Sequence, residues 1–299
     1  MLSIRTVLCP VDLSPATLRQ VDLAADLCRA FDAALVLHHN LPQVLGGAAV
    51  GWMWAADHPV SGNASEQQMR DLIARVSKGI KVDAHITHGL ALPSILAVSE
   101  AVEADLLILS THGAVNEDHT SVTERVLEDS DRAVLVLHDA SEDSHTPNFA
   151  SASGPPLVVL VPTDFTRESL PAVEFSFELA RRLPIELHLL HLEPHGKPRN
   201  EERDLEKMTG LVPDDLSART TTHIESGDAA DGIAAAATRL DAACIIMGEH
   251  ARTALRRWFS RNTSKAVLHK AHCPVWYVPG GRGARLIHDT QRPQNPAST

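Results

Sequence analysis

Two aspartates occupy matching places in the chain and could contact a ligand. Asp12 follows a short apolar run within the motif Pro-Val-Asp-Leu-Ser, and Asp164 follows a similar run within Pro-Thr-Asp-Phe-Thr. A carboxylate at the end of a strand can accept a hydrogen bond from a base amine or a ribose hydroxyl. Asp and Ser also favour the N-cap of a helix, so a capping role is the competing interpretation. The two roles are compatible, and both residues are candidate ligand contacts.

Two loops of small residues, 110–121 and 248–262, could bind phosphate through backbone N–H groups because each leads into an expected helix N-terminus. The first loop reads Ser-Thr-His-Gly, then six residues, then Thr-Ser. The second reads Gly-Glu-His-Ala, then nine residues, then Arg-Asn. The candidate ligand-binding residues of these loops are Gly113, Ser121, Gly248, Ala251 and Asn262.

Charged residues in the second loop have opposing effects on an anion. The carboxylate of Glu249 would repel phosphate. Positive charge could come from four arginines, for which a solvated helix face is the favoured interpretation: Arg252, Arg256, Arg257 and Arg261.

These residues recur because the chain contains the same unit twice. His39 falls on His191 at an offset of 152 residues, and the offset becomes 138 where Gly89 falls on Gly227. Both glycines are candidate ligand contacts. Near the ends of the two units the offset is 141. The changes of offset place the length differences in loops, where they cost little stability.

Each unit alternates short apolar runs with longer segments of helical period, which predicts a parallel, doubly wound sheet of five strands. The expected strands are 5–11, 33–39, 81–87, 104–110 and 133–138, then 157–163, 185–192, 218–225, 243–248 and 274–278. The expected helices of the first unit are 15–30, 64–79, 92–103 and 121–130, with counterparts in the second. Ser121-Val-Thr-Glu124 has the form of a capping box.

The expected domains are therefore residues 1–140 and 157–279. Residues 141–156 are polar and rich in Pro and Gly, which is typical of a linker. Residues 280–299 have little apolar content and are expected to form a disordered tail.

Composition narrows the functional classes. A net charge of −11 argues against binding to the phosphate backbone of nucleic acid or to an anionic membrane. No apolar run is long enough to insert into a membrane, and the amino terminus does not have the pattern of a signal peptide. The four cysteines form no C-x-x-C pair, which fits a reduced cytoplasmic location.

Two further features have structural interpretations. The chain has 17 histidines, several near expected strand ends, but their spacing does not favour a metal site, and none is predicted. The first unit also has an extra loop with Trp52 and Trp54, which could cover a pocket or contact a partner. Packing over its own helices is the favoured interpretation of that loop.

Taken together, these motifs resemble the universal stress protein family. The resemblance rests on the strand ending in Pro-Val-Asp, the small loop after the fourth strand, and His272-Cys-Pro-Val275 before the fifth strand. It covers about residues 5–138 and 157–279 and suggests a tandem member. It implies two adenine nucleotide alpha hydrolase-like domains and a structural role for His39 and His191, which match a histidine common in the family.

The resemblance leaves the cofactor open and makes ATP a candidate, because ATP-binding members of the family carry G-x2-G-x9-G-[ST] in this loop. Both units depart from that motif. In the first, Ser110 and Thr120 replace glycines, and the spacer is three residues short. In the second, Gly248 and the spacer are kept, Ala251 replaces a glycine, and the final Gly-Ser pair is absent. The second unit is therefore the better candidate for a degenerate ATP-type site.

The function implied is that of a cytoplasmic stress-response factor that acts by binding a ligand or partner rather than by catalysis. In the family, subunits pair through their fifth strands, so we expect segments 133–138 and 274–278 to form an internal pseudo-dimer; a homodimer is a further expectation. The alternative is an ATP-binding or ATP-hydrolysing enzyme of the same architecture. The sequence lacks the P-loop and nucleophile-elbow motifs of such enzymes, and the residues expected of a response-regulator receiver are missing as well.

Overall fold

The computed structural model describes residues 2–14, 17–41, 62–111, 121–138, 147–149, 154–194, 201–249 and 261–280. The first copy contains β1 (Thr6–Val11), α1 (Thr17–Phe31), β2 (Ala34–Leu41), α3 (Gly62–Val76), β3 (Val82–His88), α4 (Ala91–Ala101), β4 (Leu106–Thr111), α5 (Val122–Asp129) and β5 (Ala133–His138). The second contains β6 (Leu157–Pro162), α6 (Leu170–Ala180), β7 (Ile185–Glu193), α7 (Glu201–Leu211), the 3-10 helix η1 (Asp214–Arg219), β8 (Thr220–Ser226), α8 (Ala229–Arg239), β9 (Cys244–Glu249), α9 (Arg261–Lys270) and β10 (Val275–Pro279).

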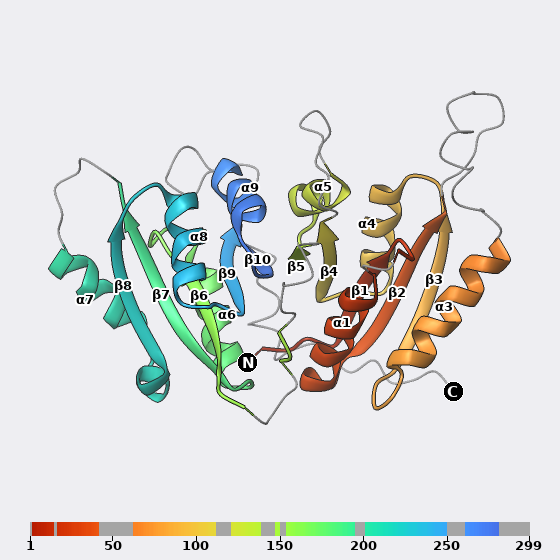
Figure 1. The fold of residues 1–299 in the computed structure, drawn as a ribbon, viewed down its shortest axis with the longest axis horizontal. Helices are drawn as coiled ribbons and strands as arrows, with labels where there is room; N and C mark the ends of the chain where they lie inside the picture. The colour runs from red at the N-terminus through yellow and green to blue at the C-terminus, as the bar shows by residue number, and fades with distance from the viewer. Residues whose placement is uncertain are drawn as a thin grey trace.

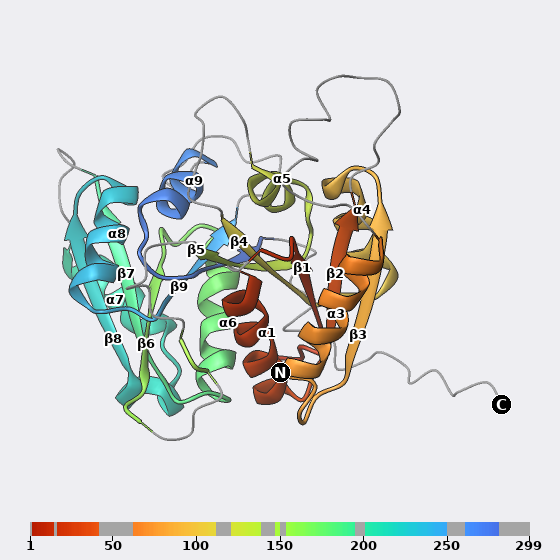
Figure 2. The same ribbon diagram turned by 45° about the vertical axis from the view of Figure 1, so that its right-hand side comes forward.

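The strands form one ten-stranded sheet in the order β3-β2-β1-β4-β5-β10-β9-β6-β7-β8 (Figure 1). Within each copy all paired strands are parallel, so the expected doubly wound α/β fold is confirmed. The observed strands agree with the expected ranges to within two residues at each end. Central strands such as β4 and β9 are buried and apolar because helices cover both faces of the sheet. Figure 2 shows α1 and α6 close together on one of these faces.

Each copy has a switch point where the chain turns from one side of its sheet to the other. In the first copy, β1 pairs with β4 only at Val7–Leu106 and Leu8–Leu107. The ladder between β6 and β9 is equally short. The carboxyl ends of these strands are therefore unpaired with each other, and a crevice at this place is where ligands bind in doubly wound folds.

The two copies meet at β5 and β10, which pair in antiparallel orientation. Leu135 lies opposite Trp276 at the middle of this short ladder. The Trp276 ring is fully buried and contacts Phe149 and Phe175 edge to face, at centroid distances of 6.5 and 5.0 Å. Phe149 belongs to the segment expected to be a linker, yet its ring lies in the core. A continuous cluster of buried side chains thus extends through both copies.

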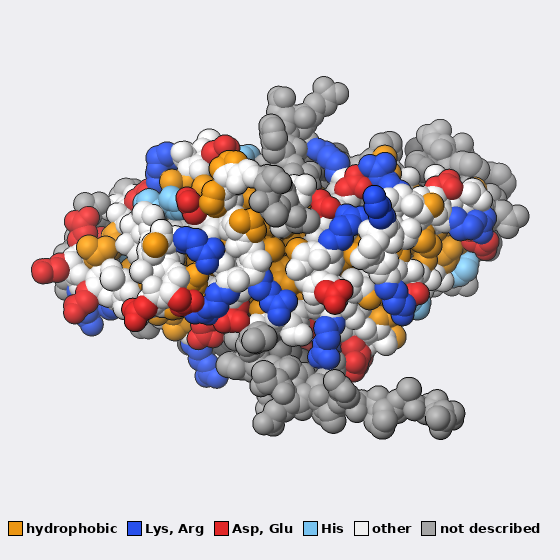
Figure 3. All heavy atoms as spheres, turned by 90° about the horizontal axis from the view of Figure 1, so that it is seen from below, with side chains coloured by type: hydrophobic (Ala, Val, Ile, Leu, Met, Phe, Trp, Pro, Cys, Tyr) orange, Lys and Arg blue, Asp and Glu red, His pale blue; other side chains and the backbone are white. Residues whose placement is uncertain are grey.

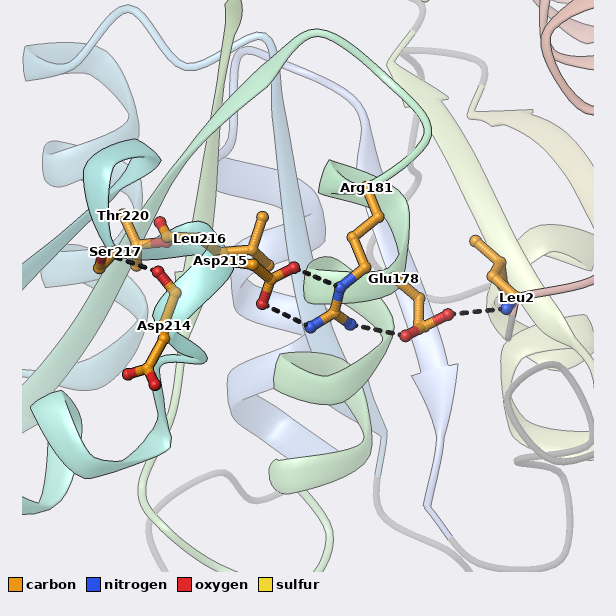
Figure 4. A network of polar contacts seen from close by, with 8 residues as sticks. All are labelled: Leu2, Glu178, Arg181, Asp214, Asp215, Leu216, Ser217 and Thr220. Atoms are coloured by element: carbon orange, nitrogen blue, oxygen red, sulfur yellow. Dashed lines mark hydrogen bonds and ion pairs between the residues drawn. The ribbon is translucent and has the colours of Figure 1, made fainter.

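The amino-terminal segment also joins the copies. Leu2 is buried, and its backbone N–H donates to Glu178 of α6 at 3.0 Å. Arg181 donates to the other oxygen of Glu178 and forms a two-pronged contact with Asp215 of η1 at 2.8 and 3.1 Å (Figure 4). Seen from below, apolar side chains are visible between the two halves, and charges of both signs are interspersed on either side (Figure 3).

Among the described helices, none combines the length and apolar character needed to cross a membrane.

Candidate functional site

The turn after β1 is closed by the Asp12 side chain. Its Oδ1 accepts hydrogen bonds from the backbone N–H of Ser14 at 2.9 Å and from the hydroxyl of Thr17, the first residue of α1, at 2.8 Å. Leu13 has a φ of 63°, so the turn passes through a region that L-residues rarely adopt. In this copy the carboxylate is solvent-exposed.

The turn after β6 is built in the same way but is more enclosed. Asp164 Oδ1 accepts from the N–H of Thr166 at 3.1 Å and from its hydroxyl at 2.5 Å. Phe165 has a φ of 60°. Asp164 Oδ2 is buried and has no hydrogen-bond partner among the described residues. The N-cap of α6 is Ser169, so the competing interpretation, in which Asp164 caps this helix, is wrong.

A histidine supports each of these turns from the neighbouring strand. His39 Nδ1 lies 2.9 Å from the carbonyl oxygen of Val11, and His191 Nδ1 lies 2.8 Å from that of Thr163. A carbonyl can only accept, so both rings carry hydrogen on Nδ1. The contact is the same in both copies, and the expected structural role of these two histidines is confirmed.

The switch point of the first copy is filled by the side chain of Gln20. This buried amide donates from Nε2 to the carbonyl oxygens of Pro10 and Ile108, both at 2.7 Å. Its oxygen accepts from the Ser110 hydroxyl at 3.1 Å. The amide therefore satisfies the carbonyls that β1 and β4 leave unpaired where they separate. Nothing in the sequence pattern identified Gln20 beyond its being a polar residue on a helix.

The second copy fills the same place with its own backbone. The residues that correspond to Gln20 and Ser110 are Ala172 and Gly248. A β-carbon on Gly248 would lie 2.3 Å from the carbonyl oxygen of Glu168 and 2.9 Å from the Cα of Ser169. Real β-carbons do not come so close to backbone atoms, so this position requires glycine for packing. Its retention is explained without a bound phosphate.

Two further candidate glycines, Gly89 and Gly227, lie in turns that join the ends of neighbouring strands. Gly89 donates its N–H to the carbonyl of Leu41 at 3.0 Å, and Gly227 donates to that of Glu193 at 3.0 Å. Gly89 has a φ of 121°, a conformation that favours glycine. Its carbonyl accepts from Asn40 Nδ2 at 2.8 Å.

Ser121 forms the N-cap of α5. Its hydroxyl accepts from the backbone N–H of Glu124 at 3.1 Å, so the first half of the expected capping box is confirmed. The second half differs. The Glu124 carboxylate accepts hydrogen bonds from Lys265 and His269 of α9 in the other copy, each at 3.1 Å. Ser121 thus has a helix-starting role whether or not a ligand is bound.

Several expected site residues lie outside the described part of the chain. These are Gly113, Ala251, the side chains of Glu249, Arg261 and Asn262, the arginines at 252, 256 and 257, and the loop with Trp52 and Trp54.

The histidines of the described residues form one direct pair. His188 Nδ1 lies 2.8 Å from His223 Nε2 on adjacent strands. Burial lowers the pKa of both side chains. Within the described ranges no three His, Cys, Asp or Glu side chains are arranged to hold a metal ion.

Comparison with known proteins gives one family. The profile of the universal stress protein family matches residues 3–138 and 158–279, once for each copy. A search of curated proteins returned no significant match.

The solved structures that are similar include a universal stress protein from Archaeoglobus fulgidus, with 20% identity, a TM-score of 0.72, and coverage of 94% of this chain and 98% of that one. A putative universal stress protein from Pseudomonas aeruginosa has 18% identity, a TM-score of 0.61, and coverage of 94% and 95%. At such identities the likeness supports the fold alone.

Proposed function

The chain belongs to the universal stress protein family, and from that premise we propose that it is a tandem stress-response protein that acts by binding an adenine nucleotide in its second copy. Binding, rather than turnover of a substrate, is the activity proposed. The location proposed is the cytoplasm. It is supported by four cysteines that are all buried and unpaired, as is usual in a reducing compartment.

The observation that carries this proposal is the unpartnered oxygen of Asp164. A buried carboxylate oxygen without a donor costs roughly 1–3 kcal/mol or more, so most such groups have a partner. Here the other oxygen holds the turn that follows β6, and β6 is one of the two strands that separate at the switch point of this copy. A ribose hydroxyl or a base amine is a donor of the right kind for this position.

The first copy supports binding less well. Its aspartate is exposed, and the Gln20 amide occupies the space where β1 and β4 separate. In the second copy the residue that corresponds to Gln20 is Ala172, and backbone of Glu168 and Ser169 packs against Gly248 instead, so the copies differ chiefly in the burial of their aspartates. The proposed site is therefore the carboxyl end of β6 and β9, and the first copy serves the pairing of the two units.

The proposal includes the association of the copies. We propose that the antiparallel contact between β5 and β10 is kept in solution, so that one chain forms an internal pseudo-dimer. Support comes from the buried side chains that extend through both copies and from the contact between Leu2 and Glu178.

Calorimetric titration of the full chain with ATP tests the binding site. Asp164→Asn keeps the oxygen that closes the turn but replaces the free acceptor with a donor amide. Losing a hydrogen bond to a charged acceptor is worth about 1.5–3 kcal/mol, so affinity should fall about 10- to 100-fold. Asp12→Asn is the matched control and should leave the affinity unchanged.

Equal affinity in the wild-type chain and Asp164→Asn would remove the second copy as the site. No heat of binding in the wild-type chain would remove the nucleotide from the proposal. Sustained phosphate release from ATP would instead favour an ATP-hydrolysing enzyme.

A further inference from the structure

The contact between the two copies has two-fold pseudosymmetry. By the offset of 141 residues, Leu135 corresponds to Trp276, and these two residues lie opposite each other. On either side of them, Val134 pairs with Tyr277 and Val136 pairs with Val275. Each contact therefore has a counterpart with the roles of the copies exchanged, as in an isologous dimer.

The helices beside these strands carry acidic side chains in the first copy and a lysine and a histidine at the corresponding positions of the second. Glu124 of α5 corresponds to Lys265 of α9, and Glu128 corresponds to His269. Lys265 Nζ lies 3.1 Å from Glu124 and 3.0 Å from Glu128, and His269 Nε2 lies 3.1 Å from Glu124. The acids of the first copy thus contact the lysine and the histidine of the second copy across the pseudo-two-fold axis.

The Glu124 carboxylate is buried, so losing its hydrogen-bond donors would leave a charge without partners in the interior. The Glu124 side chain is only 8% exposed, so its charge depends on the two donors from the other copy. Hydrogen bonds to Glu128 and Glu124 raise the pKa of Lys265, which stays charged. Among the described residues, His138 at the end of β5 is a further titratable group close to His269, and burial lowers its pKa to about 4, which keeps it neutral.

We propose that this surface selects the other copy, not an identical one, as its partner. If two first copies met in this way, Glu124 would face Glu124 and Glu128 of its twin, and four carboxylates would gather with no base between them. If two second copies met, Lys265 would face Lys265 and His269. Like charges that face each other across this contact disfavour the wrong partner.

The sizes of the side chains where β5 and β10 pair also favour the other copy over an identical one. The structure places a leucine against a tryptophan at the axis, and the ring of Trp276 fills the space between Phe149 and Phe175. A second tryptophan in place of Leu135 would overfill this space, and two leucines would leave it partly empty. Both errors destabilise a core.

The inference rests on the proposed β5–β10 pairing, and a charge exchange in the full chain tests it. Glu124→Lys and Lys265→Glu each create like-charge contacts and should lower the thermal midpoint by several degrees. The double variant restores opposite charges between positions 124 and 265, while the carboxylate at 265 still faces Glu128, so it should recover part of the summed loss. Light scattering after gel filtration should show the same mass for the wild-type chain and the double variant, so that the recovery does not come from a change of association. A matched control is Arg70→Glu on α3, which forms an exposed ion pair away from this contact.

Purely additive losses in the double variant would overturn the proposed selectivity. A separate variant, Val136→Cys with Val275→Cys, reports on the pairing itself, because these residues lie opposite each other. If the disulfide forms within one chain but the losses of thermal midpoint in the charge variants are additive, only the proposed selectivity would be overturned. Absence of that disulfide would sink the pairing, and the selectivity with it.

Discussion

Substitution of Gly248 tests whether this glycine serves packing or a ligand. A β-carbon there would lie 2.3 Å from the carbonyl oxygen of Glu168 and 2.9 Å from the Cα of Ser169, and both atoms belong to the backbone. Neither can rotate away, so Gly248→Ala must displace the turn that precedes α6. Overpacking of this kind costs about 1–3 kcal/mol of unfolding free energy.

The control is Gly232→Ala in α8. A β-carbon at Gly232 would lie 2.8 Å from the two methyl carbons of Leu192, which are the far end of a flexible side chain. Alanine also favours a helix over glycine by up to about 1 kcal/mol, which offsets part of the crowding. The net change for this variant should be within about 1 kcal/mol.

Urea unfolding followed by circular dichroism measures both changes. The midpoint of Gly248→Ala should fall clearly below that of the wild-type chain and of Gly232→Ala, without a change in the slope. Wild-type stability for Gly248→Ala would refute the packing explanation. If nucleotide affinity fell at the same time, the glycine would instead be explained by close approach of a ligand.

Three further predictions concern the interior. Gln20→Leu should lower the unfolding free energy by about 2–5 kcal/mol in urea titrations, because two carbonyls lose their donor; a loss below 1 kcal/mol would contradict the bridging role. Phe149→Ala should cost about 3–5 kcal/mol in the same assay, whereas a flexible linker would tolerate it. Burial lowers the pKa of His38 and His138 to about 4 from 6.5, so the stability they contribute is complete above pH 6.5 and is lost as pH falls towards 4. Unfolding midpoints across that range should decline, and a flat profile would contradict it.

The architecture was predictable because local patterns determine it. Alternation of apolar strands with helical segments, written twice, leaves few topologies other than a doubly wound sheet. Contacts between distant residues are less accessible to such reasoning. The bond from Gln20 to Ile108 joins residues 88 positions apart, and no periodicity indicates it.

Parts of the candidate site were misread from sequence for a related reason. The capping-box pattern predicts that the Glu124 side chain accepts a hydrogen bond from the start of its own helix. In the structure its carboxylate instead accepts a hydrogen bond from Lys265 of α9. Phe149 sits among polar residues that are typical of a linker, yet burial beside Trp276 outweighs that composition. Asp164 was identified as a candidate, but only the structure reveals that one of its oxygens is buried without a donor.

The claim that most needs testing is that the two copies have different roles, with the ligand site in the second. A crystal structure of the full chain grown with excess ATP addresses it directly. We expect nucleotide density at the carboxyl ends of β6 and β9, with a donor of the nucleotide within hydrogen-bond distance of Asp164 Oδ2. Density beside Asp12 in the first copy, or at neither place, would contradict it.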